Sequence, residues 1–557
     1  MLLGCCSCDA AAFDPAPEPD YAAAPPGQGA ALAFYLQQGA GLWSIASTLL
    51  TLQLPMSTEA GPRRLLEIGC GFGFGLDIAR RALGWDVQGY DPSPFAIAGQ
   101  EILGLPIVSA YFNPKIAAPG TQDVVLASEV LEHLTDPVGF LRGLRTVLTP
   151  GGVFVLTTPN LGSARPGTPD GLLVPLLSVG YHTLLHTAGS LTIALRQAGF
   201  TTVEIEERGA QLLAHATDGT AAWRAPHEAD RVAYRGWMAQ AAAAQPAGSD
   251  LHLGLLGRLY REAVNSGDFA AADRLLPSLD GALRSRFGTT LSDWIGAGKA
   301  TPADDLESLA VRGSLALGPL LLTLGLHRLL AGVKRPGLTQ VFETAAAEAE
   351  ALRGALRVIG SDDGDAEEVA WTAGAEAALC AAAGGATDVA ARLARLGPAP
   401  DVGDGAGMAR AAAVRRRAFV ELVNAGAYAA AKPLSDVIDS VAGRAGASAA
   451  LLEDSELDVL YCGAVAEANG GPRGDANAAV RWLRGLRAAA LRRLVTENEG
   501  GGSAAGLLWH AVELELELLH RLGRVSERAA LAGQGLQALA ANPGVPPLPP
   551  GLQSATC

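Results

Sequence analysis

Charged residues are scarce in this sequence, and basic ones are scarcer than acidic ones. Only 18% of the 557 residues are charged, and 57 Asp and Glu against 42 Lys and Arg leave a formal net charge of −15. Nucleic-acid binding relies on clustered Lys and Arg that contact phosphates, so we expect no nucleic-acid partner. The arginines between Arg410 and Arg417 fall in an alanine-rich stretch, and we expect them to form a solvated helix face.

Long apolar runs and targeting signals are also lacking. The stretch Met1–Cys5 has no basic residue before its cysteine and too few apolar ones for a lipoprotein signal. The most apolar internal run, 314–326, is interrupted by Pro319 and is shorter than the roughly 20 residues that cross a bilayer. The sequence therefore predicts a soluble, cytoplasmic protein without membrane contact, in which this run is a buried helix.

Cysteine is rare, and the seven residues do not form a regular framework. Cys5 and Cys8 have the spacing of half a zinc knuckle, but no second pair of cysteines or histidines follows nearby. Because a structural zinc site requires four ligands, we expect reduced thiols without metal here. Zinc at Cys5 and Cys8 is the alternative.

The length of the chain predicts two to four domains. Alanine becomes frequent after about residue 240, which favours helices. The expected order is an N-terminal segment with lid helices, an α/β domain, a linker, an all-helical domain and a disordered proline-rich tail. The corresponding residues are 1–60, 61–220, 221–250, 251–541 and 542–557.

Short apolar runs alternate with segments of helical spacing in the α/β region. The predicted strands cover 64–69, 86–91, 106–112, 123–128, 152–157, 201–207 and 211–216. The predicted helices cover 76–83, 95–103, 137–148 and 190–198. This order predicts a doubly wound, mostly parallel seven-stranded sheet with helices on both faces and an antiparallel last strand. Ligands of such sheets bind beyond the carboxyl ends of the strands.

The C-terminal half contains one internal similarity. Residues 262–272 (EAVNSGDFAAA) resemble residues 421–431 (ELVNAGAYAAA), and each segment predicts a helix that ends at Asn-x-Gly before a second helix. This pattern is typical of helical-hairpin repeats of the tetratricopeptide type, although no strict 34-residue period is present. Two unrelated hairpins in an alanine-rich chain are the alternative.

A dense glycine cluster follows the first predicted strand, in Glu67-Ile-Gly69-Cys-Gly71-Phe-Gly73-Phe-Gly75. Glycines at such a strand-to-helix turn let the backbone come close to a ligand. A dinucleotide would require G-x-G-x-x-G, which fails here because positions 74 and 76 are phenylalanine and leucine. No Gly-Lys-Ser/Thr follows, so the sequence also argues against a nucleoside triphosphate.

The pattern E-x-G-x-G-x-G resembles that of class I methyltransferases that use S-adenosylmethionine (SAM). The likeness extends over about residues 61–220, with further motifs in the same order. The resemblance implies a Rossmann-like fold and SAM as the cofactor. It also implies that Gly69, Gly71 and Gly73 let the loop pass beside the methionine part of SAM, with Glu67 supporting the loop.

Other cofactor contacts follow from the same resemblance. Asp91 ends the second strand and matches the acidic residue that accepts hydrogen bonds from both ribose hydroxyls, for which a carboxylate offers two oxygens. The acidic residue that often contacts adenine is replaced by Ser109, Tyr111 and Asn113, and Asn113 is our choice. Ser128, at the end of strand four, is expected to face the cofactor.

Residues 123–137 and 148–160 match the segments around strands four and five of methyltransferases that act on small molecules, sugars and quinones. Glu129 and His133 follow strand four and are the candidate catalytic residues. A histidine titrates near the working pH and can act as a general base. A purely structural role for His133 is the alternative.

Two further histidines precede the predicted helix at 190–198. The resemblance places His182 near the substrate. His182 and His186 have the spacing of a zinc-binding pair, but no third ligand stands at a useful distance in the sequence. We therefore expect no metal.

The resemblance implies transfer of the SAM methyl group to an oxygen or nitrogen of a small molecule. Because many such relatives act in bacterial polysaccharide pathways, a saccharide hydroxyl is the first expected acceptor, with quinones or other natural products as the alternative. A non-catalytic scaffold is a further possibility, against which the intact glycine series and Asp91 argue. The helical half is expected to offer a surface to a protein partner.

Overall fold

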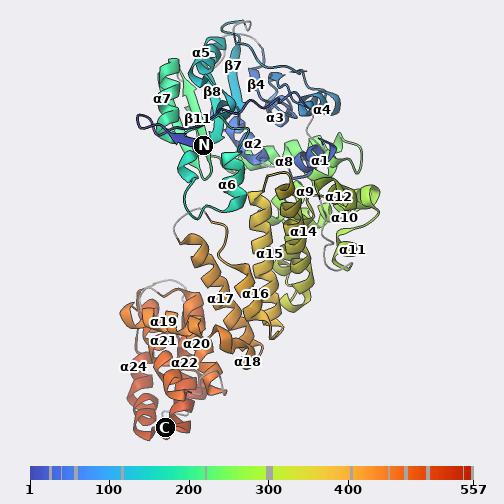
Figure 1. Ribbon diagram of the computed structural model, residues 1–557. Helices are drawn as coiled ribbons and strands as arrows, with labels where there is room; N and C mark the ends of the chain where they lie inside the picture. Colours follow the sequence, from blue (N-terminus) through green and yellow to red (C-terminus); the bar gives the residue numbers. More distant parts are fainter. Residues whose placement is uncertain are drawn as a thin grey trace. The chain divides into compact units, whose positions relative to one another are not determined.

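The computed structural model describes residues 1–23, 28–38, 41–54, 61–114, 118–219, 222–296, 305–401, 405–448, 452–469, 475–496, 502–542 and 545–553. They form two compact units (Figure 1). The first comprises Met1–His327, Thr344–Ala370 and Pro400–Gly403, and the second comprises Arg328–Glu343, Trp371–Ala399 and Asp404–Cys557. All candidate site residues belong to the first unit.

A seven-stranded sheet forms the centre of the first unit, with the order β10-β11-β8-β7-β4-β5-β6. Its strands are β4 (Arg64–Ile68), β5 (Asp86–Tyr90), β6 (Ile107–Val108), β7 (Gln122–Ser128), β8 (Leu148–Pro159), β10 (Thr202–Arg208) and β11 (Gln211–Thr217). The strands from β8 to β6 run parallel, whereas β11 pairs antiparallel with both β8 and β10. The predicted mostly parallel, doubly wound sheet is confirmed.

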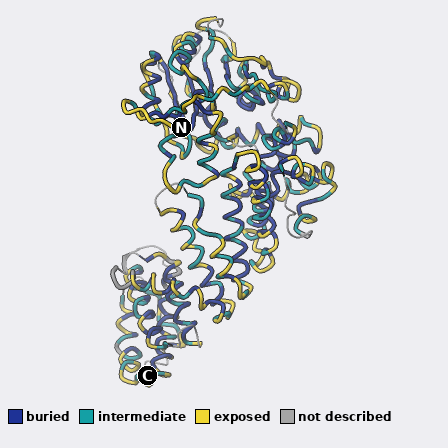
Figure 2. The backbone as a smooth tube through the Cα atoms, in the orientation of Figure 1, coloured by how far each residue is buried: buried dark blue, intermediate teal, exposed yellow. Residues whose placement is uncertain are grey.

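Residues of the central strands are buried, and Figure 2 draws them in dark blue. Leu66 and Val125 belong to one apolar cluster that includes residues of α5 (Pro137–Val147) and α7 (Ala188–Ala198). Their neighbours in the strands point to the opposite face, and they too are almost fully buried: Leu65, Val124 and Leu126. Continuous apolar strands are therefore the expected consequence of a sheet covered on both sides.

The helices of this α/β part agree with the sequence pattern, but two strands differ. α3 (Phe74–Leu83) and α4 (Pro94–Leu103) follow β4 and β5. The third predicted strand, 106–112, contains only the two residues of β6. β8 begins at Leu148, before the start of the predicted strand 152–157, and in this added stretch Gly151 has a φ of 82° and pairing with β7 is irregular.

The segment 221–250, predicted to be a linker, instead holds the helix α8 (Glu228–Ala243). Tyr234 and Trp237 are almost fully buried. The indole nitrogen of Trp237 donates to the Asp77 carboxylate on α3 at 2.9 Å. The linker prediction is wrong because aromatic residues spaced one turn apart pack this charged, alanine-rich segment against the α/β part.

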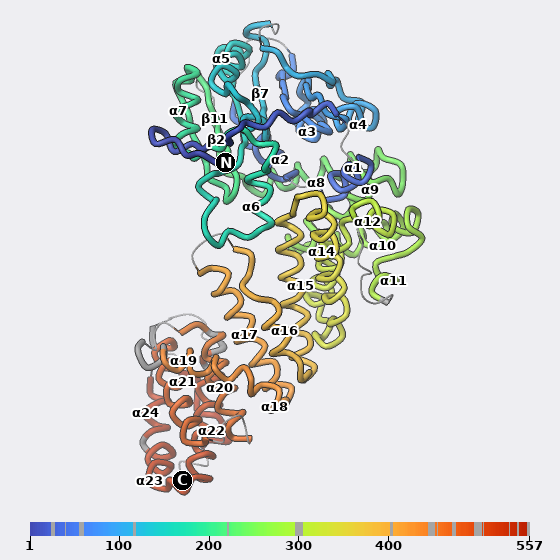
Figure 3. Tube along the Cα trace, viewed as in Figure 1, coloured from blue at the N-terminus to red at the C-terminus, as the bar shows by residue number. Residues whose placement is uncertain are grey.

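The N-terminal residues form a small sheet that the sequence did not indicate. β1 (Leu2–Gly4) pairs with β2 (Ala11–Phe13), and β2 pairs with β9 (Leu184–Leu185). In Figure 3 the dark blue N-terminal trace leads from this sheet toward α1 (Gln28–Gln38). The pairing with β9 brings the first residues of the chain to the segment that contains His182.

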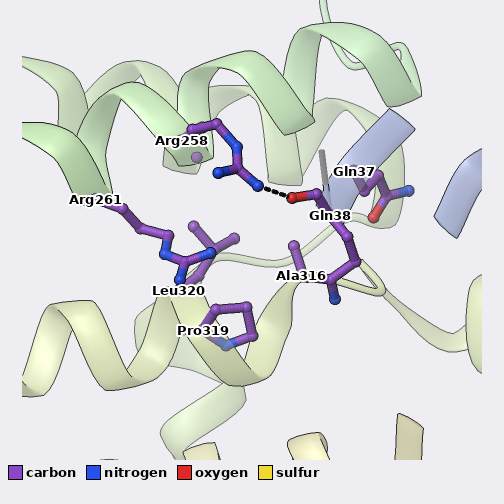
Figure 4. A pocket seen from close by; sticks show the side chains of 8 residues that line it. Gln37, Gln38, Arg258, Arg261, Ala316, Pro319 and Leu320 are labelled. Carbon is purple, nitrogen blue, oxygen red and sulfur yellow. Dashed lines mark hydrogen bonds between the residues drawn. The ribbon is translucent and has the colours of Figure 1, made fainter. Parts of the chain in front are cut away.

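The rest of the first unit is mainly helical. Its further elements are α1 (Gln28–Gln38), α2 (Leu42–Leu50), α6 (Asp170–Leu177), α9 (Asp250–Asn265), α10 (Phe269–Phe287), α11 (Leu291–Gly296), α12 (Leu306–Arg312), α13 (Leu317–Leu330), and the short strand pair β3 (Leu52–Gln53) and β12 (Ala222–Trp223). A small pocket between α1, α9 and α13 is lined by Gln38, Arg258 and Arg261, and Arg258 donates to the Gln38 carbonyl (Figure 4). It contains none of the predicted site residues.

The apolar run at 314–326 forms most of α13, and Leu320 and Leu324 are buried, as predicted. Among the described residues, no single helix is long and apolar enough to cross a membrane. The pair α12 and α13, bent by 48°, reaches that length and apolar content when the two helices are taken together.

The described residues of the C-terminal part contain helices and no strands, as predicted. Its helices are α14 (Thr339–Val358), α15 (Gly364–Ala383), α16 (Val389–Leu396), α17 (Ala406–Asn424), α18 (Tyr428–Ala431), α19 (Asp436–Ser448), α20 (Asp454–Ala468), α21 (Ala476–Thr496), α22 (Gly502–Arg521), α23 (Val525–Ala530), α24 (Leu536–Ala540) and α25 (Pro550–Gln553). The two similar segments both turn at a glycine with positive φ, Gly267 and Gly426. A tetratricopeptide-like repeat stays a prediction.

The proline-rich tail differs from the prediction of disorder over residues 545–553. Leu552 on α25 is buried in the apolar cluster of the second unit, and Val545 and Leu548 pack against that cluster. Apolar side chains between the prolines thus bind this segment to the helices. The rest of the predicted tail beyond Asn542 lies outside the described residues.

Candidate active site

The glycine loop connects β4 to α3 and requires glycine at several positions. Gly69, Gly71 and Gly73 have φ values of 67°, 53° and 88°, a region that side chains other than glycine rarely adopt. A Cβ atom on Gly73 would lie 2.6 Å from the Leu105 side chain. A Cβ atom on Gly71 would meet only the Tyr35 hydroxyl, at 3.9 Å. The backbone of the loop is therefore accessible to a ligand at Gly71.

Glu67 lies beneath the loop. A Cβ atom on Gly75 would lie 2.6 Å from the Glu67 carboxylate. Burial raises the pKa of Glu67 to about 8, although a hydrogen bond from the Leu76 backbone opposes the shift. Oε2 of this carboxyl has no hydrogen-bond partner within the described part of the chain. The position agrees with the supporting role that the resemblance implies.

Replacing Glu67 with glutamine is expected to make the stability of the protein less dependent on pH. The raised pKa means that the folded state keeps a proton that the unfolded state releases above pH 4.5, so stability falls as the pH rises to about 8. At 1.36 kcal/mol per pKa unit the loss is roughly 5 kcal/mol at most. Urea unfolding at pH 5 and pH 9 would measure it.

The matched control for this experiment is Glu101→Gln, which changes an exposed carboxylate on α4. This control should keep the pH dependence of the wild-type protein. The same loss of stability between pH 5 and pH 9 in Glu67→Gln would contradict the expectation.

Asp91 follows β5 and is tied to the glycine loop. Its Oδ2 accepts a hydrogen bond from the Gly71 amide at 2.8 Å, and its Oδ1 accepts one from the Ser93 amide at 2.7 Å. Each carboxylate oxygen can accept a further hydrogen bond. The side chain therefore has one acceptor left on each oxygen, an arrangement that fits the two hydroxyls of a ribose.

Tyr35 on α1 is a candidate cofactor contact that the sequence did not reveal. Its ring stacks on Phe95 with 5.8 Å between ring centroids and an angle of 12°, and it also contacts Phe74. Its hydroxyl lies over Gly71. Because Tyr35 precedes the α/β domain in the sequence and belongs to no motif, only the packing of α1 brings it to the loop.

Four polar side chains, two of them predicted from the sequence, meet at the end of β7. The Ser128 hydroxyl lies 2.7 Å from the Thr157 hydroxyl, which donates to the Glu129 carboxylate at 2.8 Å. Gln211 also donates to this carboxylate at 2.8 Å. Glu129 has a φ of 54°, an uncommon conformation for a residue other than glycine and one that is frequent at functional sites.

The glycine loop and the segment after β7 are adjacent. A Cβ atom on Gly69 would lie 2.4 Å from the Val130 side chain. β4 and β7 are neighbours at the point where the strand order of the sheet reverses, the usual position of a ligand in doubly wound sheets. The glycine loop and the segment that begins at Ser128 and Glu129 thus meet at the carboxyl ends of β4 and β7.

Glu132 and His133 lie in a single turn (Leu131–His133) after β7. Oε2 of Glu132 accepts a hydrogen bond from Thr158 at 2.9 Å, while its buried Oε1 accepts no hydrogen bond from the described residues and lies 3.8 Å from Nε2 of His133. Burial, together with the charge of Glu129, raises the pKa of Glu132 well above its usual range. The Glu132 carboxyl therefore tends to keep its proton, and it lies beside the candidate base, His133.

His133 is partly buried, with 22% of its side chain exposed. Its Nδ1 lies 2.6 Å from the Tyr21 hydroxyl and 3.1 Å from the Tyr181 carbonyl. Burial lowers the pKa of His133. The imidazole is consequently neutral at physiological pH, which a general base requires.

His182 lies beside His133, with 4.9 Å between the ring centroids. Its Nδ1 donates to the Leu176 carbonyl at 2.9 Å, and burial together with the proximity of His133 lowers its pKa to about 4. His186 is buried elsewhere, with Nδ1 3.2 Å from the Ser190 hydroxyl. The structure thus brings His182, but not His186, to the candidate base.

One group of side chains has the spacing of metal ligands within the described ranges. Ligand atoms of Glu132, His133 and His182 lie within 4.8 Å of one another. Cys5 is exposed and Cys8 is partly exposed, both lie next to the N-terminal strands, and neither belongs to this group. The expectation of no metal stays a prediction.

The residues predicted to contact adenine follow the short strand β6. Asn113 is exposed and follows the short strand β6, as do the two other candidates, Ser109 and Tyr111. Phe112, between them, packs edge-on against Tyr90 with 5.1 Å between the rings. The role of Asn113 stays a prediction.

Comparison with known proteins connects this geometry to a family. A methyltransferase-domain family model matches residues 44–205. A probable S-adenosylmethionine-dependent methyltransferase of Mycolicibacterium smegmatis is 36% identical over 149 residues, which cover 26% of this chain and 53% of that protein. The chain contains a class I SAM-dependent methyltransferase domain. The predicted family and the predicted cofactor, SAM, are thereby confirmed for this domain.

Other relatives of the methyltransferase domain carry more specific names. A ubiquinone biosynthesis O-methyltransferase of Cereibacter sphaeroides is 40% identical over 103 residues, 17% of this chain and 41% of that protein. A solved SAM-dependent methyltransferase of Mesorhizobium loti is 24% identical, with a TM-score of 0.26, and the match covers 32% of this chain and 98% of that one. The chain spans about half the length, or less, of the curated relatives it matches.

Proposed function

We propose that the methyltransferase domain transfers the methyl group of SAM to a hydroxyl oxygen of a small molecule. The observation that carries this proposal is the environment of His133. This histidine is partly buried beside Glu132 in the turn after β7, and its lowered pKa keeps it neutral. A neutral amine could attack the methyl group without such a base, whereas a hydroxyl must lose its proton. Oxygen is therefore favoured over the nitrogen acceptor that the sequence left open.

Bound SAM would supply a methyl carbon activated by the positive charge on sulfur. The chain has three tasks in this transfer. Asp91 and the amides of the glycine loop hold the ribose and methionine parts, so that the acceptor oxygen can align with the methyl carbon. His133 would take the proton of the acceptor hydroxyl when that oxygen receives the methyl group. Tyr21 lies against His133 and Tyr35 lies over Gly71, and both side chains would help to exclude water.

The acceptor class is the finer part of the proposal. The first expectation from the sequence was a saccharide hydroxyl. The similarity to ubiquinone biosynthesis O-methyltransferases favours a phenolic hydroxyl on a quinone-like ring instead. The rings of Tyr21 and Tyr181 lie 6.5 Å apart beside His133, and Tyr181 is 55% exposed. Such aromatic surfaces suit a planar acceptor.

A labelled-methyl assay on cell extracts tests the function. The full-length protein is incubated with extract and SAM labelled in the methyl group, and lipid and saccharide fractions are separated. We expect label in a small molecule of the lipid fraction with the wild-type protein and a large loss of label with Asp91→Ala. Label only in the saccharide fraction would return the acceptor to the first expectation, and no label in either fraction would contradict the proposed function.

A further inference from the structure

We propose that Tyr21 is a positioning residue that holds the proton of His133 on Nδ1 and so leaves Nε2 as the basic nitrogen. This inference rests on the proposed function, because it assigns a role to a residue acting through the candidate base. Tyr21 lies outside residues 44–205, which the family model matches. None of the sequence motifs described above includes Tyr21.

The N-terminal sheet places Tyr21 over His133. β2 pairs with β9, and the Phe13 amide donates to the Thr183 carbonyl at 3.0 Å. The Tyr21 ring then packs edge-on against His133, with 5.0 Å between centroids and an angle of 67°. The contact joins two residues that are 112 positions apart in the sequence.

Three atoms determine where the protons must lie. The Tyr21 hydroxyl, Nδ1 of His133 and the Tyr181 carbonyl are mutually within 2.6 to 3.1 Å. The carbonyl can only accept hydrogen bonds. When the Tyr21 hydroxyl donates to this carbonyl and Nδ1–H donates to the Tyr21 oxygen, two of the three contacts are hydrogen bonds, and in the third the carbonyl oxygen faces the N–H group rather than a lone pair.

The opposite arrangement has a clear electrostatic cost. If the Tyr21 hydroxyl donated to an unprotonated Nδ1, the Tyr181 carbonyl oxygen would face a nitrogen lone pair at 3.1 Å and a hydroxyl oxygen lone pair at 3.1 Å. Both contacts would be repulsive, and the carbonyl would lose both of its protein donors. The geometry therefore favours the Nδ1–H form of His133.

Nε2 of His133 is consequently the nitrogen that can take the acceptor proton. It lies 3.8 Å from Oε1 of Glu132, beyond hydrogen-bond distance. The neighbouring His182 uses its own Nδ1–H at the Leu176 carbonyl, so its other nitrogen carries no proton in the neutral form and cannot donate to Nε2. The groups around the base thus leave Nε2 unprotonated.

Nuclear magnetic resonance of the full-length protein, labelled with ¹⁵N-histidine, tests this inference without any substrate. The signals of His133 are assigned by their loss in His133→Gln. We expect neutral His133 to be protonated at Nδ1 in the wild-type protein and to become a mixture of both forms in Tyr21→Phe, which retains only the weaker acceptor at Tyr181. Tyr181→Phe is the matched control, because it removes a neighbouring hydroxyl but keeps the carbonyl.

A wild-type protein protonated at Nε2, or an unchanged tautomer in Tyr21→Phe, would overturn the inference. In the methyl-transfer assay Tyr21→Phe should lower kcat roughly three- to ten-fold, the effect of one neutral hydrogen bond, while the SAM affinity stays unchanged. The expected tautomers with an unchanged kcat would refute the role of Tyr21 in the reaction alone. Absence of methyl transfer by the wild-type protein would refute the proposed function and leave the tautomer assignment standing.

Discussion

Asp91→Ala is expected to weaken SAM binding on the order of 100-fold or more. The carboxylate offers one free acceptor on each oxygen, and hydrogen bonds to a charged group are worth about 1.5–3 kcal/mol each. Isothermal titration calorimetry of the full-length protein with SAM would measure the loss. Because Asp91 also accepts hydrogen bonds from the Gly71 and Ser93 amides, part of the effect comes from a loosened glycine loop.

Two further variants separate these contributions. Asp91→Asn keeps one oxygen acceptor and the shape of the side chain, so it should bind SAM with an intermediate affinity. Asp86→Ala removes an exposed carboxylate from the other end of β5 and serves as the control with wild-type affinity. If Asp91→Ala bound SAM as tightly as the wild-type protein, the ribose contact would be refuted. If the wild-type protein did not bind SAM at tens of micromolar, the scaffold alternative would be supported.

His133→Ala is expected to lower kcat for transfer to a hydroxyl by about 10²- to 10⁴-fold, the usual contribution of a general base. The SAM dissociation constant should stay unchanged, since the imidazole is expected to act on the acceptor rather than on the cofactor. His510→Gln, an exposed histidine in the second unit, is the control that should keep the full kcat.

The pH dependence of the wild-type reaction gives a second measurement of His133. Burial lowers the pKa of this imidazole from 6.5, so the neutral, basic form persists at and above that pH. The rate should therefore be constant from pH 6.5 upward and fall only at lower pH. A kcat that His133→Ala leaves unchanged would mean that His133 has the structural role that the sequence left open.

Much of the α/β fold followed from local patterns in the sequence. The apolar runs of β4 and β7 and the helical spacing of α3 gave correct elements because both faces of a buried parallel strand must be apolar. Prediction failed where local patterns were weak. α8 is alanine-rich and charged, and its helix is held to the domain by Trp237 and Asp77, which are 160 positions apart.

The candidate site shows the same division. Glu67, the glycines, Asp91, Glu129 and His133 could be named from motifs, and the structure gathers them at one edge of the sheet, while their roles remain to be tested. Tyr21 and Tyr35 could not be named, since neither has a motif or periodicity that distinguishes it from other aromatic residues. Each gains its place through the packing of the N-terminal segment.

The sequence by itself determined the cofactor corner of this protein: a strand, a glycine turn and a helix, with a carboxylate at the end of the next strand. These features depend on residues within about one strand-turn-helix unit, whose backbone preferences are local. Only the tertiary structure decided which side chains cover that corner and which groups surround the ring nitrogens of His133. Those outcomes depend on contacts between distant segments, whose free energy comes from packing and hydrogen bonds that local preferences do not contain.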